Sequence, residues 1–274
     1  MRAQNLNMLK FLSLGSGSSG NCYLLYTETD GLMIDCGVGI RTLKKHLYNY
    51  GVPLSLIHHI IVTHDHADHI KSVGTLSADY HIPVWATQSV HHGIFRNWSV
   101  KKKVDEPFRR FIEKGETQTI GEFTVTPFSV PHDSIDCVGY RIVHQDITFT
   151  IITDCGHLTD EIKQYIAESN YLIIEANHDP EMLAEGPYPE HLKVRIAGEH
   201  GHMCNQDCAK ALAENVTPKL QHVWLCHLSE ENNHPELARK TVETILASYG
   251  IVCGKDFQLD ILKRTMPSGV FECE

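Results

Sequence analysis

The segment THDHADHI, residues 63–70, brings three histidines and two aspartates together in eight positions. These side chains are His64, Asp65, His66, Asp68 and His69. The segment follows the apolar run HIIV, which predicts a buried strand, so the polar residues lie on a strand-to-helix turn. Neutral imidazole and carboxylate groups are the ligands that zinc takes in hydrolytic sites. The density of such groups favours a metal site over a solvated loop.

Three further metal-competent side chains follow strand-like segments elsewhere in the chain. His132 comes after the alternating run that contains Phe123 and Val125, and Asp154 and His227 follow the apolar runs ITFTIIT and HVWLC. Open α/β sheets collect their ligands beyond the carboxyl ends of the strands. We therefore expect these side chains to lie close to residues 63–70, which we call the dense turn. A catalytic metal centre needs ligands from more than one turn, and these residues supply them.

Apolar runs and helical periodicity alternate along the chain. The runs expected to form strands are LKFLSL, CYLLY, LMIDC, HIIVT, VWAT, FTVTPF, GYRIV, ITFTIIT, YLIIEA and HVWLC. Helical patterns occupy residues 39–51, 205–216 and 234–250, with Gly51 as the expected end of the first and Asn205 as the expected N-cap of the second. Strands and helices mixed through the whole length predict an α/β layered architecture.

The ordered set of these motifs resembles the metallo-β-lactamase-fold superfamily from about residue 12 to about residue 229. The resemblance implies a four-layer αββα sandwich with two mixed sheets and a two-metal site at one edge of them, so we expect a single domain over residues 1–274. It implies that one metal ion is held by His64, His66 and His132, and that the other is held by Asp68, His69 and His227. Asp154 would bridge the two ions, and Asp35 would support the ligands. The ions are expected to be Zn²⁺, although Mn²⁺ or Fe²⁺ would also suit these ligands.

Two longer segments resemble the WalJ/YycJ-type exonuclease branch, whose members are bacterial exonucleases that digest double-stranded DNA from the 5′ end. They are SLGSGSSGNCYLL (13–25) and EANHDPEMLAEGPYPEHLKVRIAGEHGHMCN (175–205). The second also resembles the tRNA 3′-processing nucleases, in which a glutamate orients a histidine that acts on the leaving group. By position this gives Glu175 and His202, although Met203 stands where those nucleases carry threonine or serine. We also expect His178 to contact the substrate.

A basic segment, residues 96–114, interrupts the pattern and is expected to be an insertion. It has seven basic and three acidic side chains, a net charge of +4 in a chain whose total is −10. One interpretation is a solvated surface segment. The other is a contact with the phosphate backbone of a nucleic acid, with Trp98 and Phe108 between the charges. The candidate contacts are Lys101, Lys102, Lys103, Arg109 and Arg110.

Composition limits the class of protein. The chain is 42% hydrophobic and 21% charged, which is typical of a globular protein, and it has no apolar run of membrane-spanning length. Its nine cysteines are odd in number and mostly isolated, which favours a reduced, cytoplasmic protein without a membrane partner. The acidic total charge argues against binding nucleic acid over the whole surface but leaves a local basic patch open.

These observations together predict an enzyme, a metal-dependent hydrolase that acts on phosphodiesters of nucleic acid. The resemblance implies a double-stranded DNA 5′-to-3′ exonuclease that uses a metal-bridged hydroxide held by Asp68, with His202 and Glu175 acting at the leaving group. One alternative is a small-molecule phosphodiesterase or thioesterase of the same fold. Another is a metal-binding regulatory protein without catalysis.

Overall fold

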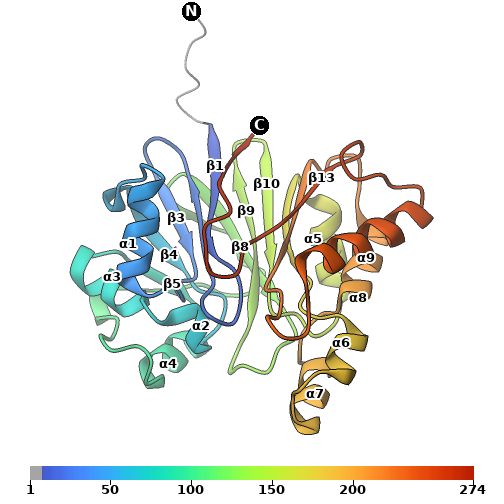
Figure 1. Cartoon of the computed structure of the whole chain (residues 1–274). Coiled ribbons are helices and arrows are strands. Elements are labelled where there is room, and N and C mark those ends of the chain that lie inside the picture. Colours follow the sequence, from blue (N-terminus) through green and yellow to red (C-terminus); the bar gives the residue numbers. More distant parts are fainter. Residues whose placement is uncertain (1–7) are drawn as a thin grey trace, which may run out of the picture.

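The computed structural model describes residues 8–274, so the first seven residues of the expected domain lie outside the described part. In this part, two seven-stranded sheets lie face to face, with helices on both outer sides (Figure 1). The first sheet has the order β14-β1-β2-β3-β4-β5-β6, and the second has the order β13-β12-β11-β10-β9-β8-β7. Each sheet contains parallel and antiparallel pairs. The expected four-layer αββα sandwich with two mixed sheets is confirmed.

Apolar and β-branched sequences form the central strands. The first sheet contains β1 (Leu9–Gly15), β2 (Cys22–Tyr26), β3 (Gly31–Ile34), β4 (Ile57–Ile61), β5 (Val84–Ala86), β6 (Arg109–Phe111) and β14 (Val270–Cys273). The second contains β7 (Gln118–Ile120), β8 (Phe123–Ser129), β9 (Val138–His144), β10 (Ile147–Ile152), β11 (Tyr171–Glu175), β12 (His222–Cys226) and β13 (Gln258–Ile261). Every residue of β2, β3 and β11 is buried, as expected for strands covered on both faces.

The helices divide between the two sides of the sandwich (Figure 1). On the side of the first sheet are α1 (Ile40–Asn49), α2 (Ala67–Ile70), α3 (Val73–Tyr80) and α4 (Gln88–Arg96), with 3₁₀ turns η1 (Leu54–Leu56) and η2 (Glu106–Phe108). On the other side are α5 (Asp160–Glu168), α6 (Pro180–Glu185), α7 (Glu190–Ala197), α8 (Asn205–Asn215) and α9 (Pro235–Ser248). Within residues 8–274, no helix is both long enough and apolar enough to cross a membrane.

The predicted cap of α8 is wrong by one residue. The cap is Cys204, whose Sγ accepts a hydrogen bond from the Asp207 backbone N–H at 3.4 Å. Asn205 is the first helical residue and is buried, and its Nδ2 donates to Asn233 Oδ1 at 3.0 Å. Because the buried Asn205 amide already has a side-chain partner, it does not cap the helix. Gly51 follows α1 in a left-handed conformation, φ 68°, as expected.

An aromatic cluster joins the two sheets. Trp224 on β12 of the second sheet lies against Phe11 on β1 of the first, with ring centroids 4.7 Å apart. Phe149 and Phe271 pack around the same indole at 5.7 and 5.1 Å. This contact holds the two sheets face to face and so fixes the strand ends that carry the site.

The basic segment 96–114 is partly built into the fold. Its residues Arg109–Phe111 form β6, which pairs with β5 in parallel at the edge of the first sheet. Gly74 on α3 packs directly under it, because a Cβ there would lie 1.7 Å from the Lys102 carbonyl oxygen. The segment therefore contacts both the sheet and a helix. It is more a part of the fold than the expected insertion would be.

Candidate metal centre and active site

The strands that carry the site all point their carboxyl ends to one edge. β3 and β4 are parallel in the first sheet, and β10, β11 and β12 are parallel in the second. Asp35 follows β3 directly, and the dense turn follows β4. On the second sheet, Asp154, Glu175 and His227 lie at or just beyond the ends of β10, β11 and β12. Residues far apart in the sequence are thereby gathered at the junction of the sheets.

Three of these residues have an unusual backbone. Asp35, Asp154 and His227 adopt left-handed conformations, with φ of 57°, 49° and 53°. Such a conformation costs a non-glycine residue on the order of 1 kcal/mol or more and persists only when the surroundings hold it. Such conformations at three strand ends that meet in one place are typical of a functional site.

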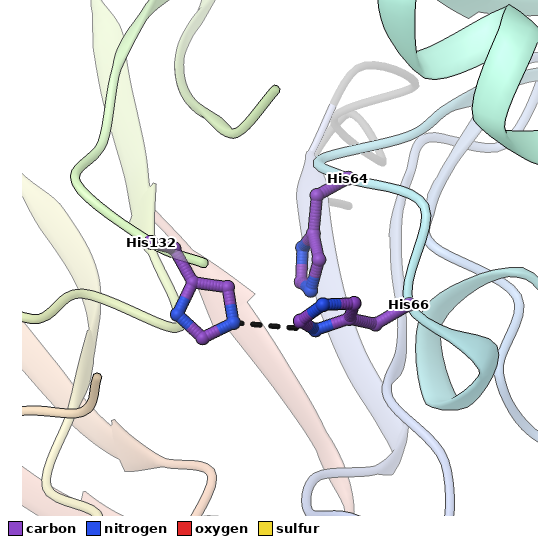
Figure 2. A group of neighbouring side chains, drawn as sticks. All are labelled: His64, His66 and His132. Carbon is purple, nitrogen blue, oxygen red and sulfur yellow. Dashed lines mark hydrogen bonds between the residues drawn. The ribbon is translucent and has the colours of Figure 1, made fainter. Parts of the chain in front are cut away.

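The first ligand group consists of histidines from two loops. His64 and His66 follow β4, and His132 faces them from the loop after β8 (Figure 2). His132 Nε2 lies 3.2 Å from His66 Nδ1, and His132 Nδ1 donates to the Gly201 carbonyl at 2.9 Å. The buried Nε2 of His64 has no hydrogen-bond partner among the described residues. The ligand atoms of these three side chains lie within 4.8 Å of one another.

The second group joins the dense turn to β12. Asp68, His69 and His227 also place ligand atoms within 4.8 Å of one another. Like that of His64, the buried Nε2 of His227 finds no hydrogen-bond partner in the described part of the chain. A buried ring nitrogen without a partner is costly unless a ligand satisfies it.

Asp154 lies between the two groups. Its Oδ2 is 2.8 Å from His69 Nε2 and 3.8 Å from His64 Nε2, and its Oδ1 is 2.5 Å from His227 Nδ1. It forms a further candidate ligand set with His64 and His69. One carboxylate is therefore within reach of both groups, which is the arrangement that a bridging ligand requires.

Asp35 orients the ligands without joining either group. Its Oδ2 accepts a hydrogen bond from His69 Nδ1 at 2.7 Å and another from Thr63 Oγ1 at 2.8 Å. Its Oδ1 accepts the Thr63 backbone N–H at 2.8 Å. Because Nδ1 of His69 carries the proton, Nε2 is the nitrogen left for a metal ion.

Glu175 ties two histidines together. Its Oε1 accepts from His202 Nδ1 at 2.8 Å and from His227 Nδ1 at 2.9 Å. Its Oε2 accepts the backbone N–H groups of Cys155 and Met203 at 2.8 and 3.0 Å. Burial would raise the pKa of Glu175, but the charge and hydrogen bond of His202 outweigh burial and bring the pKa to about 2. Met203 contributes its backbone N–H to this network, which needs no hydroxyl side chain.

The electrostatics of the site suit a cation. Burial, followed by the charge of His69, lowers the pKa of His64 well below its ordinary value and keeps that imidazole neutral. Burial also lowers the pKa of His69, but the charges of Asp154 and Asp35 outweigh burial and raise this pKa to about 10. Burial also opposes a charge on His227, and Asp154 again raises its pKa well above the ordinary value. A divalent cation among these groups would displace the protons that the carboxylates attract. The donor set and the two unpaired Nε2 atoms fit such an ion.

Sequence reasoning missed several supporting residues. Asn21, in the glycine-rich turn, donates from Nδ2 to Asp68 Oδ2 at 3.2 Å, and Ser16 Oγ accepts the His227 backbone N–H at 3.0 Å. Asp133 lies beside the first group, with Oδ1 3.4 Å from His132 Nε2, and pairs with Arg195 of α7. The only local signal for Asp133 is its place beside His132. Asn21 and Ser16 act across 47 and 211 residues of sequence, which no local pattern reveals.

The basic residues predicted to contact the substrate have different partners in the structure. Lys102 pairs with Asp79 at 2.5 Å, and Lys103 donates to the Asn97 carbonyl at 2.7 Å. Arg109 and Arg110 donate to backbone carbonyls of Val104 and Pro107. Lys101 instead lies over the exposed Trp98 ring, 5.7 Å from its centroid, in a groove that reaches Asp68.

His178 is not at the surface of the site. Only 3% of it is exposed, and burial lowers its pKa to about 4, so the imidazole is neutral. It lines a cavity of about 300 Å³ between α6 and α7. The structure therefore places its side chain at this cavity, which shares no lining residue with the groove at Lys101.

Comparison with known proteins decides the family. The sequence profile of the Beta-lactamase superfamily domain matches residues 31–227. The chain belongs to the metallo-β-lactamase superfamily. It is 32% identical over 268 residues to exodeoxyribonuclease YycJ of Bacillus anthracis, covering 96% of this chain and 98% of the relative. It is 33% identical over 250 residues to exodeoxyribonuclease WalJ of Streptococcus pneumoniae serotype 2, covering 91% and 93%. It is thus a WalJ/YycJ-type member of the superfamily.

A solved structure confirms the fold. The metallo-β-lactamase fold protein YhfI of Bacillus subtilis superposes with a TM-score of 0.72 at 20% identity, covering 97% of this chain and 100% of that chain. The fold, the family and the clustered histidines and aspartates identify the protein as a metal-dependent hydrolase.

Proposed function

We propose that the protein is a two-metal phosphodiesterase that acts on nucleic acid, as a 5′-to-3′ exonuclease of double-stranded DNA. The observation that carries the proposal is the position of Asp154, which lies within reach of two separate ligand groups. His64, His66 and His132 would hold one ion, and Asp68, His69 and His227 the other. We propose Zn²⁺ as the native ion, since imidazole and carboxylate ligands suit it.

Two metal ions, when bound, supply a nucleophile at neutral pH and stabilise the charge that gathers on a phosphodiester under attack. The residues of the chain supply the rest. Asp68 is only partly buried, so its carboxylate can orient an attacking water from the open side of the site. His202 is held through Nδ1 by Glu175, which leaves Nε2 as the atom that can donate a hydrogen bond to the departing oxygen.

The choice of nucleic acid rests on the relatives. Both curated relatives are named exodeoxyribonucleases and align over more than nine tenths of this chain. Against it stands the formal charge of −10, which leaves phosphate binding to local basic groups. All nine cysteines are unpaired, which suits a protein of the reducing cytoplasm, where DNA ends would be met.

The decisive experiment is digestion of a linear duplex labelled at either its 5′ or its 3′ ends, with Zn²⁺ or Mn²⁺ added. We expect stepwise shortening from the 5′ end. A variant with Asp68→Ala and His69→Ala is the control, and its circular dichroism spectrum shows whether it folds. Loss of digestion in this folded variant would link the activity to the candidate centre.

Two other outcomes would redirect the proposal. Shortening from the 3′ end would keep the nuclease and reverse its polarity. No digestion by a protein with two metal ions per chain would favour the small-molecule phosphodiesterase or thioesterase. Hydrolysis of bis-p-nitrophenyl phosphate would then favour the phosphodiesterase over the thioesterase. A failure to hydrolyse both phosphodiesters and thioesters would favour a regulatory protein without catalysis.

A further inference from the structure

A groove beside the metal centre contains the most exposed tryptophan of the described chain. It has a volume of about 310 Å³, and its lining includes Ser18, Ser19, Asp68, Lys71, Trp98 and Lys101. We call it the Trp98 groove. The groove reaches the centre directly, because Asp68 is both one of its lining residues and a candidate metal ligand.

The side chains of the groove have the chemistry that recognises a nucleotide. Trp98 is 81% exposed, whereas the other two tryptophans are buried or half-buried. Lys101 lies over its ring, and Lys71 lines the same groove. An exposed indole stacks on a nucleobase, and lysines beside it bind the phosphate, which is how proteins hold single strands. The exposed residues Ser18 and Ser19 line the same groove, and their hydroxyls are available to the sugar or phosphate.

Two segments that contribute lining residues to the groove are hydrogen-bonded to the dense turn, residues 63–70. In one segment, Asn97 donates from Nδ2 to the Asp65 carbonyl at 2.9 Å, and its own carbonyl accepts Lys103 Nζ at 2.7 Å. In the other segment, the Asn21 backbone N–H donates to the Asp68 carbonyl at 2.7 Å. The hydrogen bonds of Asn97 thus fix the backbone next to Trp98 relative to the turn that contains Asp65 and Asp68. Such preorganisation is a property of binding sites.

The size of the groove selects its ligand. A volume of about 310 Å³ is at the low end of small-ligand sites and accommodates one nucleotide. Stacking on Trp98 also needs a free base face, which the interior of a duplex does not offer. Lys102 and Lys103 are already paired, so within the run 101–103 the cation over the ring is Lys101.

We propose that the Trp98 groove binds one unpaired nucleotide next to the scissile phosphate, with its base stacked on Trp98 and its phosphate held by Lys71 and Lys101. This inference rests on the proposed function and deepens it. It implies that a duplex is digested through a terminal nucleotide that has opened and entered the groove.

The kinetic test compares two substrates on the same loaded enzyme. One is a short DNA duplex oligonucleotide with an unpaired thymidine at its 5′ end, and the other is bis-p-nitrophenyl phosphate, which has no base. We expect Trp98→Ala to lower kcat/KM for the oligonucleotide about 5- to 150-fold relative to that for the small diester. Trp98→Phe should recover most of this ratio. Lys71→Gln and Lys101→Gln should each raise KM for the oligonucleotide and make it less dependent on salt.

Matched controls come from exposed residues of α1, outside the groove. Tyr48 is 85% exposed, and Lys44 lies over the Tyr80 ring at 5.0 Å, so Tyr48→Ala and Lys44→Gln remove a similar aromatic ring and a similar charge. We expect both to keep the wild-type ratio. A Trp98→Ala ratio equal to that of Tyr48→Ala would overturn the groove and leave the phosphodiesterase standing.

A binding test does not depend on turnover. Thymidine 5′-monophosphate added to the loaded enzyme should quench the tryptophan fluorescence, and inorganic phosphate, which has no base, should not. The quenching should vanish in Trp98→Phe, because Trp224 is fully buried and Trp85 half-buried. Equal responses to the nucleotide and to phosphate would refute the groove even if the enzyme hydrolyses DNA. Selective quenching without hydrolysis of any phosphodiester would instead refute the proposed function.

Discussion

At the scale of single residues, the candidate metal ligands differ from the buried carboxylates that orient them. Asp35 and Glu175 are both fully buried, and the oxygens of each accept hydrogen bonds from histidine Nδ1 atoms and backbone N–H groups. Carboxylates used in this way fix the orientation and tautomer of an imidazole. His202 is the histidine of this network that remains partly exposed, which sets it apart from His69 and His227.

This difference predicts how a variant of His202 behaves. We expect His202→Ala to lower phosphodiester turnover about 10²- to 10⁴-fold, as for loss of a proton donor, while the metal content stays at the wild-type level. Elemental analysis of the purified protein and steady-state rates measure the two properties. His64→Ala is the comparison and should lose metal. Equal metal loss in both variants would make His202 a ligand, because its Nδ1 also lies 3.3 Å from Asp154 Oδ1.

At the scale of elements, the loop between β3 and α1 supports the dense turn, residues 63–70, by backbone contacts. The Cys36 N–H donates to the His69 carbonyl at 2.6 Å, and the Gly37 N–H donates to the Asn21 carbonyl at 2.8 Å. Gly37 lies so close that a Cβ there would be 1.6 Å from the Asp68 carbonyl oxygen. The position of Asp68 therefore depends on a glycine thirty-one residues earlier in the sequence.

Gly37→Ala tests this packing. The added methyl group meets backbone, which cannot rotate away, so we expect the free energy of unfolding to fall by about 1–3 kcal/mol and metal affinity to fall with it. Guanidinium unfolding and titration with a chelator measure these changes. Gly39→Ala is the control, because nothing lies within 4 Å of a Cβ there and its φ of −58° suits any residue. Similar effects of the two substitutions would mean that the close contact has no energetic role.

The elements also show what sequence can and cannot predict. The expected apolar runs all form strands. Continuous runs such as those of β2 and β11 are buried on both faces, and β9 alternates between buried and partly exposed residues. β6, β7, β13 and β14 were missed, since three or four residues at a sheet edge give no periodic signal. The polar residues after strand ends could be predicted as a cluster because parallel strands bring their carboxyl ends together. The hydrogen bond from Asn21 to Asp68 and the different partners of Lys101 and Lys102 depend on tertiary contacts, which a local sequence pattern does not encode.

At the scale of the whole molecule, the metal centre lies at the junction of the two sheets and depends on their mutual position. The first ligand group draws His64 and His66 from the side of the first sheet and His132 from the second. The ring of Phe11 in the first sheet contacts Trp224 and Phe149 in the second, so aromatic packing also joins the two sheets. We infer that the chain folds as one domain, because neither sheet can bury its inner face without the other.

This inference predicts a single unfolding transition. In guanidinium, far-ultraviolet circular dichroism and tryptophan fluorescence should give the same midpoint, as expected for cooperative unfolding. Phe11→Leu in the first sheet and Phe149→Leu in the second should each shift that one transition, by roughly 1–3 kcal/mol, since both rings are fully buried between the sheets. An exposed substitution such as Tyr48→Ala should leave it in place. Two transitions, each moved by only one of the two core variants, would show that the sheets fold as separate units. The metal centre would then form only after they dock.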